Sequence, residues 1–331
     1  MNRRTAILFA VLAVLTALLF GCDMAVGSVD VSLREVWAAL TGGECDEAVR
    51  DVILKIRIIK ALMAVMAGAA LAVAGLQMQT LFRNPLAGPY VLGISSGASL
   101  GVALYLLGAP MAGAAGAAVQ NLGVAGAAWV GAAAVLAAVM AVSRRIKDIM
   151  VILILGMMLG SAIGSVVEIL QYLGTEAALK SFVVWTMGSL GDVTAAQAAL
   201  IAPLLAAGLA LAVAAVKPLN MLLLGENYAR SMGLDARRAR AVVFLSTVLL
   251  AGTVTAFCGP IGFVGLAVPH VARMLFATAD HRTLMPASAL LGAAMLLVCD
   301  MISKSLTLPV NSITALLGIP IVMLVVVRNN G

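Results

Sequence analysis

Long apolar runs, separated by short polar or proline-containing segments, follow one another along nearly the whole chain. A helix needs roughly 20 predominantly apolar residues to cross the hydrocarbon core of a bilayer. We predict about ten such helices, at residues 5–22, 58–81, 90–108, 120–142, 149–173, 194–216, 239–258, 261–278, 284–303 and 309–327. The junction of the third and fourth is the least defined, because alanine and glycine fill residues 109–128. The pattern predicts an all-α polytopic membrane protein in which residues 1–331 form one transmembrane domain.

Composition and charge agree with this fold class and orient it. Hydrophobic residues make up 63% of the 331 residues and charged residues 11%, and the mean hydropathy is +1.11. Lysine and arginine favour cytoplasmic loops. A cytoplasmic N-terminus divides them fourteen to seven, with both termini inside. The inner set is Arg3, Arg4, Arg83, Arg144, Arg145, Lys147, Lys217, Arg230, Arg237, Arg238, Arg240, Arg273, Arg282 and Arg328, and the outer set is Arg34, Arg50, Lys55, Arg57, Lys60, Lys180 and Lys304. The net charge of +6 is thus a topology signal, and nucleic acid is not an expected partner.

The N-terminal segment has two interpretations. Basic residues, an apolar stretch and then Leu19-Phe20-Gly21-Cys22 resemble a lipoprotein signal that ends in a modified cysteine. Phe20 is bulky for that position and the rest of the chain is membrane-embedded, so we favour an uncleaved first span. Cys22 and Cys45 would both lie outside, and their spacing does not decide whether they pair. Cys258 and Cys299 are typical small apolar residues of spans.

Several motifs of enzymes are absent from the sequence. No lysine follows a glycine, so the chain has no phosphate-binding loop of the G-x-x-x-x-G-K type. It also lacks His-Glu-x-x-His and Cys-x-x-Cys, and its only histidines are His270 and His281. A metal site, a metalloprotease and a redox enzyme are therefore not expected. The energy for any transport comes from another chain or from an ion gradient.

A proline-rich polar turn interrupts the apolar pattern between the second and third spans. It reads Asn84-Pro85-Leu86-Ala87-Gly88-Pro89, and Gly93-Ile94-Ser95-Ser96-Gly97-Ala98 follows. Proline cannot continue a helix and biases the preceding residue away from helical geometry. We predict a rigid turn that joins two spans.

The longest polar interruption on the inner side runs from Lys217 to Arg240. Gly225 and Gly233 bracket a predicted short helix, with Glu226 at its start favouring the helix dipole and Gly233 able to form a left-handed cap. Such a helix at the membrane surface suits docking into a cleft of a soluble partner. The alternative is a connecting loop with cytoplasmic arginines, and the ordered glycine pattern favours docking.

The fifth span combines small residues with polar ones. Gly156, Gly160 and Gly164 form a repeated small-xxx-small pattern that permits close helix contact. Another face carries Ser161, Ser165, Glu168 and Tyr172 at spacings of four, three and four. We expect this span to line a translocation path. Glu168 equally fits an anchor at the outer interface.

Two further groups of residues indicate contacts. The segment 259–270 contains glycines and two prolines within apolar sequence, which predicts a broken helix. His270 and Arg273, one turn apart, are placed to hold a neighbouring loop. On the outer side, Arg57, Lys60 and Lys304 are either snorkelling anchors or a cationic ring that docks a partner's carboxylates.

Taken together, these motifs resemble the FecCD or BtuC-like permease subunits of importers powered by ATP-binding cassettes. The matches extend over nearly the full length. They are Gly68-Ala69-Ala70-Leu71 with Gly75 and Gln79, Asn84-Pro85-Leu86-Ala87, Gly93-Ile94-Ser95-Ser96-Gly97-Ala98, Leu224-Gly225-Glu226, Met232-Gly233-Leu234, Gly259-Pro260-Ile261-Gly262-Phe263-Val264-Gly265-Leu266 with Pro269-His270, Asp280-His281-Arg282, Leu308-Pro309-Val310 and Gly318-Ile319-Pro320.

The resemblance implies a homodimer of ten-span subunits in the bacterial inner membrane, two cytoplasmic ATPase subunits and an external binding protein. It implies import of ferric siderophores, haem or cobalamin, no enzymatic activity or bound cofactor in this chain, and ATP with Mg on the partner ATPase. By position it implies three groups of site residues. ATPase coupling falls on Leu224, Gly225, Glu226, Ala229, Met232 and Gly233, the cytoplasmic gate on Asn84, Pro85 and Leu86, and binding-protein docking on Arg57, Lys60 and Lys304.

The chain departs from the family pattern in two places. The usual Arg-Leu-Pro-Arg reads Arg57-Ile58-Ile59-Lys60, which keeps the charge, and Asn311 replaces the glycine expected after Leu308-Pro309-Val310. An ion-gradient-driven transporter remains the alternative function, although it needs mid-membrane carboxylates that are nearly missing here. A membrane scaffold without transport leaves the glycine-rich, proline-broken spans unexplained. The carried chelate has no readable code in the sequence.

Overall fold

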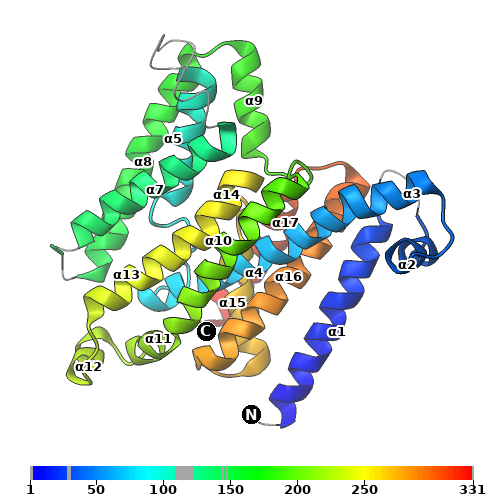
Figure 1. Ribbon diagram of the computed structural model, residues 1–331. Helices are drawn as coiled ribbons and strands as arrows, with labels where there is room; N and C mark the ends of the chain where they lie inside the picture. The colour runs from blue at the N-terminus through cyan, green and yellow to red at the C-terminus, as the bar shows by residue number, and fades with distance from the viewer. Residues whose placement is uncertain (1–2, 28–30, 109–122, 144, 147, 330–331) are drawn as a thin grey trace.

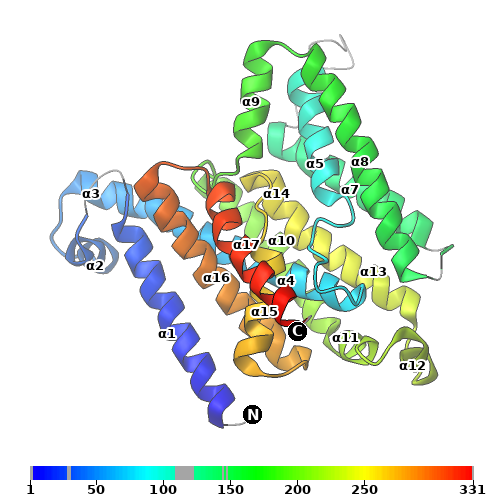
Figure 2. The same cartoon turned by 180° about the vertical axis from the view of Figure 1, so that it is seen from behind.

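A computed structural model describes residues 3–27, 31–108, 123–143, 145–146 and 148–329, and this part of the chain contains helices and no strands (Figures 1 and 2). The α-helices are α1 (Arg3–Ala25), α2 (Leu33–Thr41), α3 (Glu47–Val52), α4 (Ile58–Leu81), α5 (Ile94–Ala103), α7 (Gly123–Ser143), α8 (Ile149–Leu173), α9 (Glu176–Thr186), α10 (Ala195–Ala214), α11 (Val216–Leu222), α12 (Glu226–Ser231), α13 (Ala236–Thr247), α14 (Thr253–Cys258), α15 (Val264–Phe276), α16 (His281–Leu306) and α17 (Val310–Asn329). Three π-helical turns continue or join them: η1 (Ile53–Arg57), η2 (Leu104–Gly108) and η4 (Val248–Gly252).

Ten apolar helical segments correspond in position to the ten predicted spans. Seven described helices are long and apolar enough to cross a membrane: Arg3–Ala25, Glu47–Leu81, Gly123–Ser143, Ile149–Leu173, Ala195–Ala214, Ala236–Cys258 and His281–Leu306. Three shorter apolar helices complete the set: Ile94–Gly108, Val264–Phe276 and Val310–Val325. Residues 120–122 of the predicted fourth span, and Arg144 and Lys147 of the inner basic set, lie outside the described residues.

The third and eighth spans begin later than the sequence predicts. Non-helical backbone occupies residues 83–93 and 259–263, with positive φ at Gly93 (77°) and Phe263 (64°) immediately before each helix. The 13-residue α15 is only about 20 Å long at 1.5 Å per residue, against a hydrocarbon core of about 30 Å. The predicted broken helix at 259–270 is therefore confirmed, with the break at its start.

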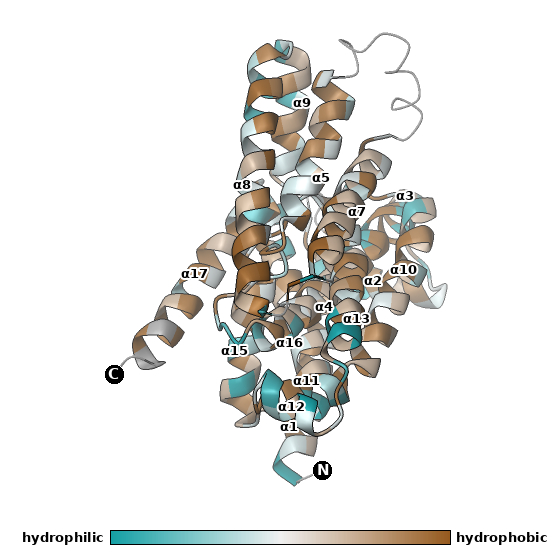
Figure 3. Ribbon diagram, turned by 90° about the vertical axis from the view of Figure 1, so that its left-hand side faces the viewer, coloured by the Kyte–Doolittle hydropathy of each residue, from teal (hydrophilic) through white to brown (hydrophobic). Residues whose placement is uncertain are grey.

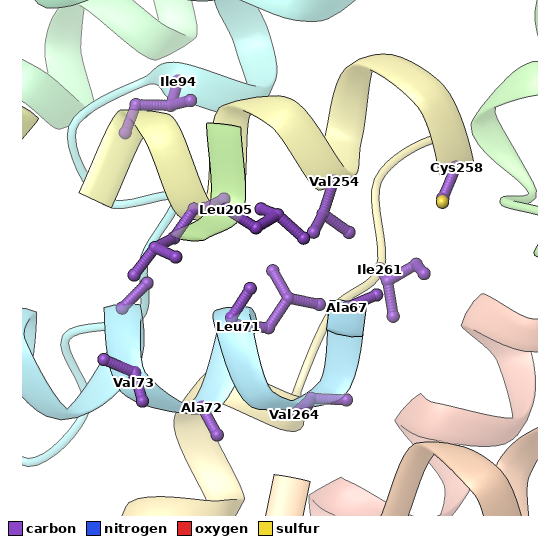
Figure 4. Packing of buried hydrophobic residues seen from close by; sticks show 14 of the residues in the cluster. Ala67, Leu71, Ala72, Val73, Ile94, Leu205, Val254, Cys258, Ile261 and Val264 are labelled. Atoms are coloured by element: carbon purple, nitrogen blue, oxygen red, sulfur yellow. The ribbon is translucent and has the colours of Figure 1, made fainter. Parts of the chain in front are cut away.

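The helix α4 is the centre of the packing. It contacts α16, α15, α10, α13 and α1, and most of its residues from Ala61 onward are buried. Figure 4 shows Ala67 and Leu71 of α4 facing Leu205 of α10 and Val254 of α14. Glycines allow the backbones to approach: a Cβ on Gly75 would collide with the carbonyl of Gly265 in α15. The start of α15 and, through Gly68 and Gly292, the middle of α16 are therefore packed directly on α4.

The short helices α2, α3 and α9 lie outside the predicted spans and were not predicted. A Ser32 capping box starts α2, and Thr175 caps α9 after the fifth span. Figure 3 shows apolar colours along α8 and polar colours gathered around α12 and the start of α13. Figure 2 shows the start of α1 and the last turns of α17 directed toward the same end as α12, as an even number of crossings requires.

Candidate functional site

The turn after α4 is fixed by its own hydrogen bonds. Asn84 donates its backbone N–H to the carbonyl of Gln79 at 3.1 Å, and its side-chain Oδ1 accepts the N–H of Leu86 at 2.9 Å. Arg83 takes a positive φ of 48°, which turns the chain out of the helix. Leu86 is left exposed. The structure thus shows the predicted rigid turn, with Leu86 presented outward.

Helix α15 holds this turn from the side. Nε2 of His270 lies 2.8 Å from the carbonyl oxygen of Pro85 and donates to it. Arg273, one helical turn later, donates to Gln79 Oε1 at 2.6 Å, and Gln79 Nε2 donates to the carbonyl of Leu266 at 3.0 Å. The prediction that these two residues hold a neighbouring loop is confirmed for His270, whereas Arg273 binds Gln79 inside α4. They join α15 to the end of α4 and to the turn.

A second set of polar contacts joins α11 to the same region. Asn220 donates to Asp280 Oδ1 at 2.6 Å and accepts the backbone N–H of His281 at 2.9 Å. Nδ1 of His281 lies 2.7 Å from the same Asn220 oxygen, and Nε2 lies 2.8 Å from Thr80 Oγ1 in the last turn of α4. The pKa of Asp280 is below its usual value, because the Arg282 N–H and then Asn220 donate to the carboxylate. An ionised Asp280 therefore caps α16 at neutral pH.

The predicted short helix is present as α12 between two glycines with positive φ. Gly225 has φ 102° and Gly233 has φ 86°, and the Gly233 N–H donates to the carbonyl of Arg230 at 2.9 Å, as expected for a left-handed cap. Ala229 is fully buried. Exposed apolar side chains recur every four residues along this segment, at Leu224, Tyr228 and Met232. We call these three residues the α12 stripe.

Glu226 has a role that the sequence analysis missed. Its carboxylate accepts hydrogen bonds from Arg230 at 2.6 Å and from Arg240 of α13 at 2.5 and 2.7 Å. Arg240 is buried, and it also donates to the carbonyl of Ile146 before α8 at 3.2 Å. Glu226 therefore ties α12 to α13 and to the α7–α8 loop. The spacing of Glu226 and Arg230 is a sequence signal for their pair, but the contact with Arg240 depends on the fold.

On α8 the structure confirms part of the predicted pattern. Ser161, Ser165 and Glu168 are exposed on one side of the helix, and the two serines donate to carbonyls one turn back in α8. Gly156 and Gly160 pack against the segment from Val91 to Ser96. Gly164 does not make such a contact, because no described atom lies within 4 Å of the position that a Cβ would take.

Two of the three predicted docking cations, Arg57 and Lys304, have largely buried side chains. Arg57 donates to the carbonyls of Met24 and Ala25 at 2.9 and 2.7 Å. Lys304 pairs with Asp23 at 2.9 Å and with Asp300 at 2.6 Å, and Lys60, which is partly exposed, lies 3.4 Å from Asp300. These charges join the end of α1, the start of α4 and the end of α16. Docking of a binding protein through Arg57, Lys60 and Lys304 stays a prediction.

Cysteines and metal-binding groups add no further site in the described part of the chain. Cys22 and Cys45 are not paired in the structure. No group of three or more His, Cys, Asp or Glu side chains among the described residues could hold a metal ion.

Comparison with known proteins gives consistent relatives. The chain is 34% identical to the hemin transport system permease protein HmuU of Yersinia pestis, over 91% of this chain and 90% of that protein. It is 35% identical to the vitamin B12 import system permease protein BtuC of Escherichia coli, over 81% of each. A solved structure described as an inward-facing metal-chelate type ABC transporter matches with a TM-score of 0.84 and 28% identity, over 97% of this chain and 99% of that one.

The family comparison covers almost the whole chain, including α12, the turn after α4 and α15. The model of the FecCD transport family matches residues 13–328. With relatives that cover most of both chains, this match makes the chain a multi-pass permease of the metal-chelate, haem and vitamin B12 type of ABC importer. The chain belongs to the FecCD transport family.

Proposed function

We propose that this chain is the permease subunit of an ATP-driven importer that carries a metal chelate, such as a ferric siderophore, haem or cobalamin, across the bacterial inner membrane. It works as a homodimer with two cytoplasmic ATP-binding subunits, and an external binding protein delivers the substrate. The observation that carries the proposal is the arrangement of α12. It exposes the α12 stripe, and the pair of Glu226 with the buried Arg240 fixes it to α13. The names of the hemin and vitamin B12 permeases support the substrate class.

In the proposed mechanism, α12 docks into a cleft of the ATP-binding subunit through the α12 stripe. ATP and Mg bind to that subunit, and this chain contributes no catalytic group and no bound cofactor. Glu226 transmits the displacement of α12 to α13 and to the α7–α8 loop through Arg240. Since both termini share the α12 end of the molecule, they lie in the cytoplasm.

The displacement also reaches the gate along the polar contacts. From α11, the path runs through Asn220 and His281 to Thr80, next to the turn of Asn84, Pro85 and Leu86. Two copies of that turn meet below the translocation path, with Leu86 as an apolar plug. The polar face of α8, with Ser161, Ser165 and Glu168, lines the path.

The test is uptake by proteoliposomes that contain this chain and its ATP-binding subunit, with the binding protein on the substrate side. Labelled haem, cobalamin and a ferric siderophore are supplied in separate experiments. We expect one of them to accumulate only when ATP is present on the side of the ATP-binding subunit. Protonophores and sodium ionophores should leave the rate unchanged. Uptake driven by an ion gradient without ATP would establish the alternative, a secondary transporter.

A further inference from the structure

Helix α2 is a well-defined helix in the first outer segment of the chain. At its start, the Ser32 hydroxyl accepts the N–H of Glu35, and the Glu35 carboxylate accepts the N–H of Ser32 at 2.8 Å. At its end, Gly42 takes a left-handed conformation with φ 77°. Both ends are capped within the chain, so the face that α2 presents is set by its sequence.

The apolar side of α2 is only half covered by protein. At about 100° per residue, Val36 and Ala39 occupy one part of the helix surface, and both are buried. The adjoining part carries Leu33, Trp37 and Leu40, which are 58%, 70% and 42% exposed. Together these five side chains form one continuous apolar arc of roughly 160°. Large apolar side chains gathered in this way mark an interaction surface.

The neighbour of α2 is an apolar helix that is mostly exposed. Helix α2 contacts α1 and lies beside the outer end of α1 at the edge of the molecule (Figures 1 and 2). Only 11% of the residues in the most apolar stretch of α1 are buried. Its exposed large apolar side chains are Ile7, Val11, Val14, Leu15 and Leu18. Helix α2 therefore lies beside the exposed apolar surface of α1, near the end of that span.

We propose that α2 lies in the interfacial layer of the outer leaflet, with Leu33, Trp37 and Leu40 inserted at the boundary between headgroups and acyl chains. Trp side chains are enriched at this depth, since the indole is apolar and keeps one N–H donor for the headgroup region. Arg34, at the border of the apolar arc, is placed to reach lipid phosphates. A short amphipathic helix with an apolar arc of this width is typical of interfacial membrane helices. The partner is thus the phospholipid surface itself.

The test measures the depth of Trp37 in the full chain reconstituted into phospholipid nanodiscs. Acyl-chain-brominated lipids quench indoles in the bilayer, and acrylamide quenches indoles in water. The Trp37 signal is the difference in emission between the unchanged chain and Trp37→Phe, so Trp129 and Trp185 stay in place. We expect this signal to be blue-shifted, to lose more than half its intensity with brominated lipid, and to respond little to acrylamide. In Leu33→Gln/Leu40→Gln, the emission should shift to the red.

One result would overturn the proposal. If acrylamide quenches a red-shifted Trp37 signal and brominated lipid does not, the uncovered face of α2 lies in water. If the external binding protein then shields Trp37 from acrylamide, that face is a protein-docking site. The Trp37→Phe chain keeps an aromatic ring of similar shape, and size-exclusion chromatography before reconstitution checks that both chains are folded.

Discussion

Lys304 is held by two buried carboxylates, one from α1 and one from its own helix, α16. Asp23 and Asp300 have almost no exposed surface, and Lys304 lies within 2.9 Å of both. A buried charge needs its partner, because removing one member of such a pair costs about 3–5 kcal/mol. Exposed pairs contribute only about 0–1 kcal/mol. The two kinds of lysine on the outer side should therefore behave differently.

We predict that Lys304→Met lowers the melting temperature of the detergent-solubilised chain strongly, and that Lys55→Met barely changes it. Lys55 is exposed and pairs only with Asp51 on its own helical turn, so it is a matched control. The measurement is the loss of monodisperse protein on heating. The effect of Lys304→Met should persist at high salt, because buried pairs are weakly screened. Equal melting temperatures for the two variants would show that the buried pairs of Lys304 do not stabilise the fold.

The role of Glu226 in docking can be tested by binding of the ATP-binding subunit. Glu226→Ala removes the carboxylate that Arg230 and the buried Arg240 share. We expect at least about tenfold weaker binding of the ATP-binding subunit, which corresponds to about 1.4 kcal/mol. Substrate-stimulated ATP hydrolysis should fall with it. Arg230→Ala is the control, because it removes only an exposed pair one turn away, worth about 0.3–0.5 kcal/mol. If Glu226→Ala and Arg230→Ala bind the ATP-binding subunit with equal affinity, the pair of Glu226 with Arg240 does not position α12 for docking.

Among the elements, α15 connects the packing core to the gate turn. Its N-terminal part crosses α4 at Gly75 and Gly265 without room for a Cβ. One turn further, its polar face reaches the turn through His270 and the end of α4 through Arg273. A shift of α15 against α4 is therefore resisted by backbone contact, and the turn is held to a rigid support.

We predict that His270→Ala uncouples ATP hydrolysis from transport. It removes the partly buried hydrogen bond to the Pro85 carbonyl. Such a bond contributes about 0.5–1.5 kcal/mol, so the turn should leave its closed position more readily. Hydrolysis should continue, while the substrate carried per ATP falls. Met274→Ala, on the exposed side of the same helix, should keep the ratio of wild type. An unchanged ratio in His270→Ala would show that the turn is held elsewhere.

The elements also show what the sequence can predict. The fifth span was predicted at 149–173 and forms α8 over the same residues, because uninterrupted apolar sequence with a following glycine defines both ends. The start of α15 was predicted too early, since the positive φ of Phe263 is imposed by the fold. The turn at Asn84 and the cap at Gly233 were visible because proline and glycine act locally. The pair of Lys304 with Asp23 was not, because 281 positions separate them.

At the scale of the whole molecule, the proposed coupling surface and the proposed gate lie toward the same end of the molecule. The α12 stripe is exposed at that end, and Leu86 is exposed on the turn that follows α4. Polar contacts from α11, α15 and α16 connect the two regions within one subunit. Gating in a homodimer then requires that the two Leu86 side chains approach and separate as the ATP-binding subunits change state.

The central claim is that nucleotide on the partner subunit moves this gate through α12, and crosslinking of Leu86→Cys tests it most directly. The background carries Cys22→Ser and Cys45→Ser, because Cys258 and Cys299 are buried. In the assembled complex, we predict efficient crosslinking between the two copies in one nucleotide state and poor crosslinking in another. Adding Glu226→Ala should abolish that difference. Crosslinking that is absent in every state, in a complex shown to be dimeric, would contradict the account and place the gate elsewhere, with the polar face of α8 as the next position to test.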